Sequence, residues 1–135
     1  MCNSLGKTIE DGDMNSAMKA GYFYTFSGAH TFDIVYVDSS NNNVYVIEAK
    51  GTQQGSAANL ITRQGGKTQG QWNYLDEVAT EMANSGDARK MEAAAKIQNA
   101  GPGKLYYVGV HTTYAIDNSG NYSANQPAPI FNKNR

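Results

Sequence analysis

The chain has 135 residues, of which 40% are hydrophobic and 17% charged, so it is too apolar for a disordered chain and too sparsely charged for a coiled coil. Its formal net charge of -1 argues against a passive nucleic-acid binder that depends on a strongly basic surface. Cys2 is the single cysteine, which excludes a disulfide scaffold and a multi-cysteine zinc site.

The first half of the chain predicts one helix and three strands. Apolar residues recur at loosely helical spacing over residues 9–21, and an aromatic strand is expected over 22–26. Residues 32–37 and 44–50 are two β-prone runs separated by the turn-forming segment DSSNNN, so they predict a hairpin. Apolar residues lie on both faces of each run, which places the hairpin inside a sheet.

The second half predicts a loop, two helices and a long strand. Residues 51–67 are polar and contain no acidic residue, which is typical of a loop. Thr68 to Gln71 has capping-box spacing and predicts a helix that begins there, and a second helix is expected over 87–99. Residues 104–116 predict a strand ended by the turn DNSG, and the tail then adds an edge strand or frays.

These elements indicate an α/β (α+β) fold, with a central mixed sheet and flanking helices in a single domain over residues 1–135. Asp33 lies one residue into the first run of the hairpin, and Glu48 and Lys50 stand near the end of the second. Side chains alternate along a strand, so Glu48 and Lys50 share one face. Hairpin pairing then brings Asp33 close to Glu48.

Two carboxylates and an amine at one end of an apolar hairpin are costly to bury unless a cation compensates them. Mg²⁺ suits oxygen ligands, and an ion bound by Asp33, Glu48 and the Ala49 carbonyl would polarise a phosphate and activate a water. Lys50 would orient that water or offset developing charge. The alternative is a solvated strand end; the metal interpretation is favoured because residues 48–50 form the only acid-x-Lys triplet of the chain.

The pattern resembles the PD-(D/E)xK nuclease superfamily, whose core has an Asp on one strand and Glu-x-Lys on the next. The resemblance extends to the restriction-endonuclease-like toxins of bacterial polymorphic, contact-dependent and type VI effectors. It covers roughly residues 28–82 and is carried by four segments: GAHTFDIVY at 28–36, VIEAKG at 46–51, LITR at 60–63 and QGQWNYL at 69–75. The chain departs from the superfamily's name pattern, because Thr31 and Phe32 precede Asp33 where a proline can stand.

The resemblance implies further site residues. In those toxins a Gln at the start of the helix after the hairpin joins the catalytic group, and Gln69 matches it; the alternative is an ordinary first-turn residue. Glu10 is the candidate for an acidic residue that the family often has on its first helix, but no motif anchors it. His30 is either a base or metal ligand or a structural turn histidine. His111, inside an apolar run, is expected to be a core residue.

Arg63 and Lys67 lie in the acid-free loop, where they either contact phosphates of the substrate or are ordinary surface cations. The resemblance implies a metal-dependent endonuclease, with Mg²⁺ as the expected ion and Mn²⁺ or Zn²⁺ as alternatives. DNA is the first choice of substrate. An RNase, such as a tRNase, of the same fold and a catalytically silent nucleic-acid-binding or interaction module are the other possibilities.

The resemblance also implies a biological setting. The chain would be the C-terminal toxin domain of a larger effector used in interbacterial competition, delivered by a secretion system into the cytoplasm of a target bacterium. A cognate immunity protein would protect the producer. No basic segment with an apolar core opens the sequence, and no run approaches the roughly 20 apolar residues of a membrane span, so neither a signal peptide nor a membrane span is expected.

Overall fold

The computed structural model describes residues 21–135. The expected helix over residues 9–21 and Glu10 lie outside this part, except for Gly21, which begins a strand. The described elements are β1 (Gly21–Thr25), β2 (Ile34–Asp38), β3 (Asn43–Gln53), α2 (Trp72–Ala83), α3 (Ala88–Gln98), β4 (Leu105–Ile116), β5 (Tyr122–Ala124) and β6 (Ala128–Asn134). The α+β class expected from the sequence is confirmed.

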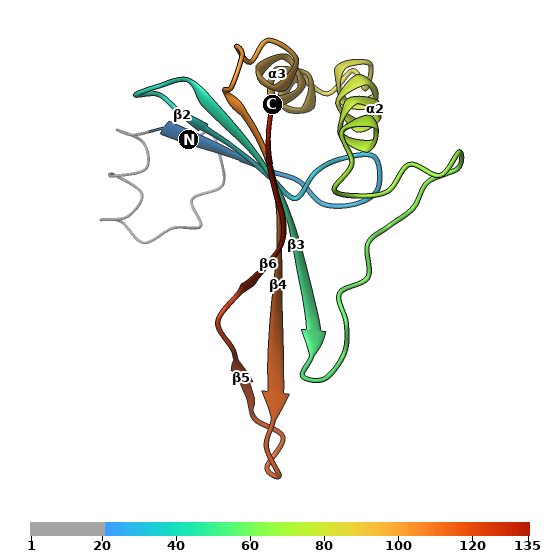
Figure 1. Cartoon of the computed structure of the whole chain (residues 1–135), viewed down its shortest axis with the longest axis vertical. Helices are drawn as coiled ribbons and strands as arrows, with labels where there is room; N and C mark the ends of the chain where they lie inside the picture. Colours follow the sequence, from blue (N-terminus) through green and yellow to red (C-terminus); the bar gives the residue numbers. More distant parts are fainter. Residues whose placement is uncertain (1–20) are drawn as a thin grey trace.

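The strands form one mixed sheet. Its order is β1-β2-β3-β4-β5, and β6 also pairs with β4 (Figure 1). The β3–β4 pair is parallel and the other pairs are antiparallel. The expected hairpin is β2–β3, and it lies inside the sheet as predicted, because β1 flanks β2 and β4 flanks β3. The tail contributes two strands, β5 and β6.

The core lies between the sheet and the two helices. Val35, Val46 and Tyr107 stand in one row across β2, β3 and β4, and none of them is exposed. They belong to the same buried cluster as Leu75 of α2 and Ala94 of α3. The flanking helices expected from the sequence are therefore present, and both described ones lie on the same face of the sheet.

Beyond this core, β3 and β4 continue together and form an arm with β5 and the first part of β6 (Figure 1). The sequence predicted that the strand ends near Lys50, but β3 runs on to Gln53. The parallel pairing with β4 continues past Lys50, from Gly51 opposite Thr112 to the end of β3. It can do so because backbone hydrogen bonds need no apolar side chain. The side chains of this arm are half-buried or exposed.

The start of α2 differs from the prediction. The capping-box residues do interact, since Gln71 Oε1 accepts a hydrogen bond from the backbone N–H of Thr68 at 3.0 Å. That bond closes a turn before the helix, and Gly70 inside the turn has a φ of 96°. The helix itself begins at Trp72, with Gln71 as its N-cap. In α3, by contrast, Asp87 accepts from Lys90 N as an ordinary N-cap.

Candidate active site

Asp33 and Glu48 lie on the same face of the sheet. Val35 is paired with Val46, so continuing the alternation two residues outward places Asp33 beside Glu48 on the helix-covered face. Asp33 precedes the first residue of β2, and its Oδ2 accepts a hydrogen bond from the backbone N–H of Ala49 at 2.7 Å. This bond fixes the first carboxylate against the strand that carries the second.

Glu48 is a buried carboxyl group with only 2% of its surface exposed. Burial, and to a smaller extent the negative charge of Asp33, raise the pKa of Glu48 to about 7. Tyr107 opposes the shift by donating a hydrogen bond to Glu48 Oε2 at 3.2 Å, and the charge of Lys50 and a bond from Gln69 also favour the ionised form. Glu48 therefore changes its protonation state near neutral pH in the metal-free protein.

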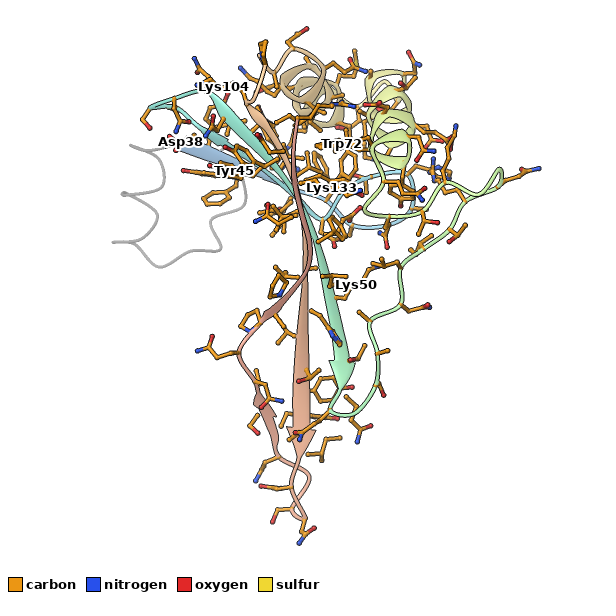
Figure 2. All side chains as sticks on the ribbon, viewed as in Figure 1. Asp38, Tyr45, Lys50, Trp72, Lys104 and Lys133 are labelled. Atoms are coloured by element: carbon orange, nitrogen blue, oxygen red, sulfur yellow. The ribbon has the colours of Figure 1, made fainter. Side chains whose placement is uncertain are left out.

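Lys50 follows Glu48 by two residues on the same strand and is half-buried. Figure 2 shows it where β3 leaves the part of the sheet that the helices cover. Its partner across the β3–β4 pair is His111. His111 was expected to be a core residue, but the structure places it half-exposed on the arm, with Nε2 2.6 Å from Thr52 Oγ1.

Gln69 enters the site from the loop that precedes α2. It is 6% exposed, and its Oε1 accepts a hydrogen bond from the backbone N–H of Ile61 at 2.9 Å. With its carbonyl oxygen engaged there, the amide nitrogen is the group of Gln69 that can lower the pKa of Glu48. Gln69 thus lies in the turn before the helix rather than in its first turn, and it connects the loop to the buried carboxylate.

Arg63 and Lys67 are held by acidic side chains of α2. Arg63 donates to Glu77 at 2.8 Å and to Glu81 at 2.7 Å, and Lys67 donates to Glu77 at 2.6 Å. The loop itself is acid-free, so its sequence did not reveal these partners. Contact of the two cations with phosphates stays a prediction. The bonds in the structure tie the loop to the helix.

His30 lies at the rim of the same region in a turn, with a φ of 62°. Its Nδ1 is 2.9 Å from Glu81 Oε1 and 2.8 Å from Arg63 Nη2. These contacts hold His30 beside α2, and its role as a base or metal ligand stays a prediction. Tyr107 was not predicted to contribute, because an apolar strand pattern carries no sign of the distant acid that its hydroxyl meets.

One cavity of about 280 Å³ is lined by every predicted site residue except Lys67. Its lining includes Asp33, Glu48, Ala49, Lys50, Arg63 and Gln69. A larger hollow of about 750 Å³ lies at the opposite end of the sheet and is lined by Tyr22, Glu92 and two lysines among others. That hollow contains one carboxylate and no acid pair, so chemistry rather than size identifies the candidate site.

The residues of the smaller cavity fit a hard divalent cation. Asp33 Oδ2 is engaged by the Ala49 N–H, which leaves Oδ1 of Asp33 and the carboxylate of Glu48 as anionic donors. The N–H and C=O of one strand residue point to the same edge, so the Ala49 carbonyl lies on the Asp33 side as well. Mg²⁺ is commonly bound by one or two carboxylates with water in its other positions.

Within residues 21–135, no group of three or more His, Cys, Asp or Glu side chains is placed to hold a metal ion. The expected set contains only two such side chains and a backbone carbonyl, so this finding does not bear on it.

None of the helices in residues 21–135 is long and apolar enough to cross a membrane. No protein-family model matches the chain, and no curated protein or solved structure matches it at a significant level.

Proposed function

We propose that this chain is a metal-dependent endonuclease of the PD-(D/E)xK type that hydrolyses phosphodiester bonds. One observation supports the proposal above the others. Asp33, Glu48 and Lys50 meet Gln69 in a single cavity, although the last residue comes from a loop far along the chain. A merely solvated strand end does not account for a Glu48 that is 2% exposed next to a second acid.

Each residue has a defined role in this proposal. Asp33, Glu48 and the Ala49 carbonyl hold the cation, which when bound supplies Lewis-acid activation of the attacking water and of the scissile phosphate. The Lys50 ammonium donates to a phosphate oxygen and offsets the charge that develops there. The Gln69 amide, fixed by Ile61 N–H, orients the Glu48 carboxylate. Burial keeps competing water away from that carboxylate.

DNA is the proposed substrate, and the setting is that of a toxin domain delivered into the cytoplasm of a target bacterium, with an immunity protein as partner. The support is the likeness of residues 28–82 to restriction-endonuclease-like toxins. RNA is the alternative substrate of the same chemistry. Incubation with plasmid DNA and with total RNA, each with Mg²⁺, Mn²⁺ or Zn²⁺, separates the two.

The mutational test uses matched controls from the far end of the sheet, where Figure 2 shows Asp38 and Lys104 away from Lys50. Glu48→Gln and Lys50→Ala should reduce cleavage at least about 100-fold, on the scale of losing one charged transition-state contact. Asp38→Asn and Lys104→Ala should cleave as the wild type does. Wild-type cleavage that survives excess EDTA contradicts the metal role, and tight binding without product in every metal indicates a silent binding module.

A further inference from the structure

The arm formed by β3 and β4 carries a row of polar side chains that continues from the candidate active site. Lys50 is paired with His111, and Thr52 with Thr113. Alternation places all four on the same face as Glu48. Asn125, which follows β5, joins them, because its Nδ2 donates to Thr113 Oγ1 at 2.8 Å. We call these five residues the arm strip.

The hydrogen bonds along the arm strip show which groups are available for a ligand. Thr52 Oγ1 lies 3.2 Å from the Ser56 carbonyl and 2.6 Å from His111 Nε2, so the Thr52 hydroxyl is already engaged on both sides and orients the imidazole. The hydroxyl oxygen of Thr113 accepts from Asn125, so the Thr113 proton is the one free to be donated. The arm strip therefore presents hydroxyl and ammonium donors beside an oriented imidazole.

Away from the active-site carboxylates of Asp33 and Glu48, the charge around the arm strip has one sign. No Asp or Glu occurs in residues 49–75 or 93–116, and the one acid of the arm beyond Glu48 is Asp117, in the turn at its tip. Successive rows of side chains on one strand face are about 6–7 Å apart, which is comparable to the spacing of successive phosphates along one nucleic-acid strand. A phosphate backbone laid on the arm strip meets donors and no carboxylate.

We infer that the arm strip binds the sugar-phosphate backbone of the nucleic acid on one side of the scissile phosphate. This inference rests on the proposed function, because it takes the substrate from there. Two features of the structure select this ligand over a protein partner. The donors begin at Lys50, inside the active-site cavity, and the acid-free face is complementary to a polyanion rather than to an apolar protein surface.

The test places a negative charge on each face of the same strand. Thr112 and Thr113 are adjacent, half-buried residues of β4 whose side chains point to opposite faces. Thr113→Glu and Thr112→Glu are each made in full-length protein that also carries Glu48→Gln, so that the probe stays intact. Affinity for a fluorescein-labelled DNA duplex and for a labelled tRNA is measured by anisotropy. We expect Thr113→Glu to weaken binding about tenfold and Thr112→Glu to weaken it less than about twofold.

A second pair guards against a folding defect of either glutamate variant. Asn125→Asp adds a negative charge to the arm strip without a change of shape. Asn132→Asp adds the same charge to the other face of the sheet, on β6 opposite Val108. The inference is overturned if, in both pairs, the two variants bind the probe with the same affinity. Unchanged affinity in all of them would fit an arm that binds a protein, and an equal loss would show no preference for either face. A face-specific loss of binding supports it even if the otherwise wild-type chain cleaves nothing, which would contradict only the proposed function.

Discussion

Tyr107 and Glu48, which are 59 residues apart in the chain, are joined by a buried hydrogen bond of 3.2 Å between the parallel strands β4 and β3. Burial beside Glu48 raises the pKa of the tyrosine, so its hydroxyl remains a donor throughout the range in which Glu48 titrates. The bond favours the ionised carboxylate, and it thereby lowers the pKa that burial and Asp33 have raised.

Tyr107→Phe should therefore raise the pKa of Glu48 above its value of about 7. A larger fraction of Glu48 is then protonated at any given pH near neutrality, and a protonated carboxyl is a poor metal ligand. We expect the acidic limb of the pH profile of kcat/KM to move to higher pH, with rates recovering well above the pKa.

Tyr106→Phe is the control for that profile, because Tyr106 is the next residue and stacks on Tyr45 across the opposite face. Its acidic limb should coincide with that of the wild type. A Tyr107→Phe profile that also coincides with the wild type would show that the bond does not tune Glu48.

The raised pKa of Glu48 makes the stability of the metal-free protein depend on pH. The folded state holds the proton more tightly than the unfolded chain, so this contribution to stability is complete below the unfolded pKa of 4.5 and is lost as pH rises through about 7. The loss is about 3 kcal/mol if the full shift is expressed. In EDTA, the free energy of unfolding measured in urea should be higher for Glu48→Gln than for the wild type, and this difference should be larger above pH 7 than below pH 4.5.

Addition of Mg²⁺ or Mn²⁺ should reverse that order above the pKa, because a cation that binds only the folded wild type stabilises it by mass action. A thermal melt in each ion measures this directly. A Tm of the wild type that no divalent cation raises more than that of Glu48→Gln would contradict the proposed metal site.

Arg63 should matter for stability more than Lys67, although both contact Glu77. Arg63 is 14% exposed in its side chain and bridges two acids, whereas Lys67 is 38% exposed and contacts one. Removing a nearly buried partner leaves the acids uncompensated, so Arg63→Ala should lower the free energy of unfolding by about 2 kcal/mol. Lys67→Ala should cost less than about 1 kcal/mol.

The kinetic constants separate this loop-tying role from a phosphate contact. If Arg63 acts through the position of Gln69, then Arg63→Ala lowers kcat together with stability. A rise in KM at unchanged stability and kcat would instead assign Arg63 to substrate binding, as the loop sequence suggested.

Gly109 is a packing position next to the site. A Cβ built there lies 2.3 Å from Phe131 Cε2, a contact that forces the ring of β6 to move. Gly109→Ala should therefore lower the free energy of unfolding by about 2 kcal/mol, the usual cost of overpacking a core. At Gly101 the nearest atom to an added Cβ is 3.6 Å away, so Gly101→Ala should change it by less than about 1 kcal/mol. Equal melting temperatures for the two variants would show that β6 yields freely.

The local pattern of the sequence was enough to predict the main elements between residues 22 and 116. Alternating β-branched and aromatic residues around the DSSNNN turn indicated the β2–β3 hairpin, and Asp87 with the AGPG segment indicated α3. These signals succeed because they depend on residues close together in the chain. The acid-x-Lys triplet located the candidate site for the same reason, since Glu48 and Lys50 are on one strand.

Only the tertiary structure decided how those residues are arranged. The parallel β3–β4 pairing extended β3 through Gly51 to Gln53 and brought His111 beside Lys50, and neither outcome follows from local propensity. Burial by distant segments raised the pKa of Glu48 and supplied its Tyr107 donor. The ion pairs of Arg63 likewise needed α2 to be packed against the loop. Burial, charge pairing and strand register depend on contacts between segments far apart in the chain. The periodicity of a sequence reports only on residues close together, so it cannot predict these contacts.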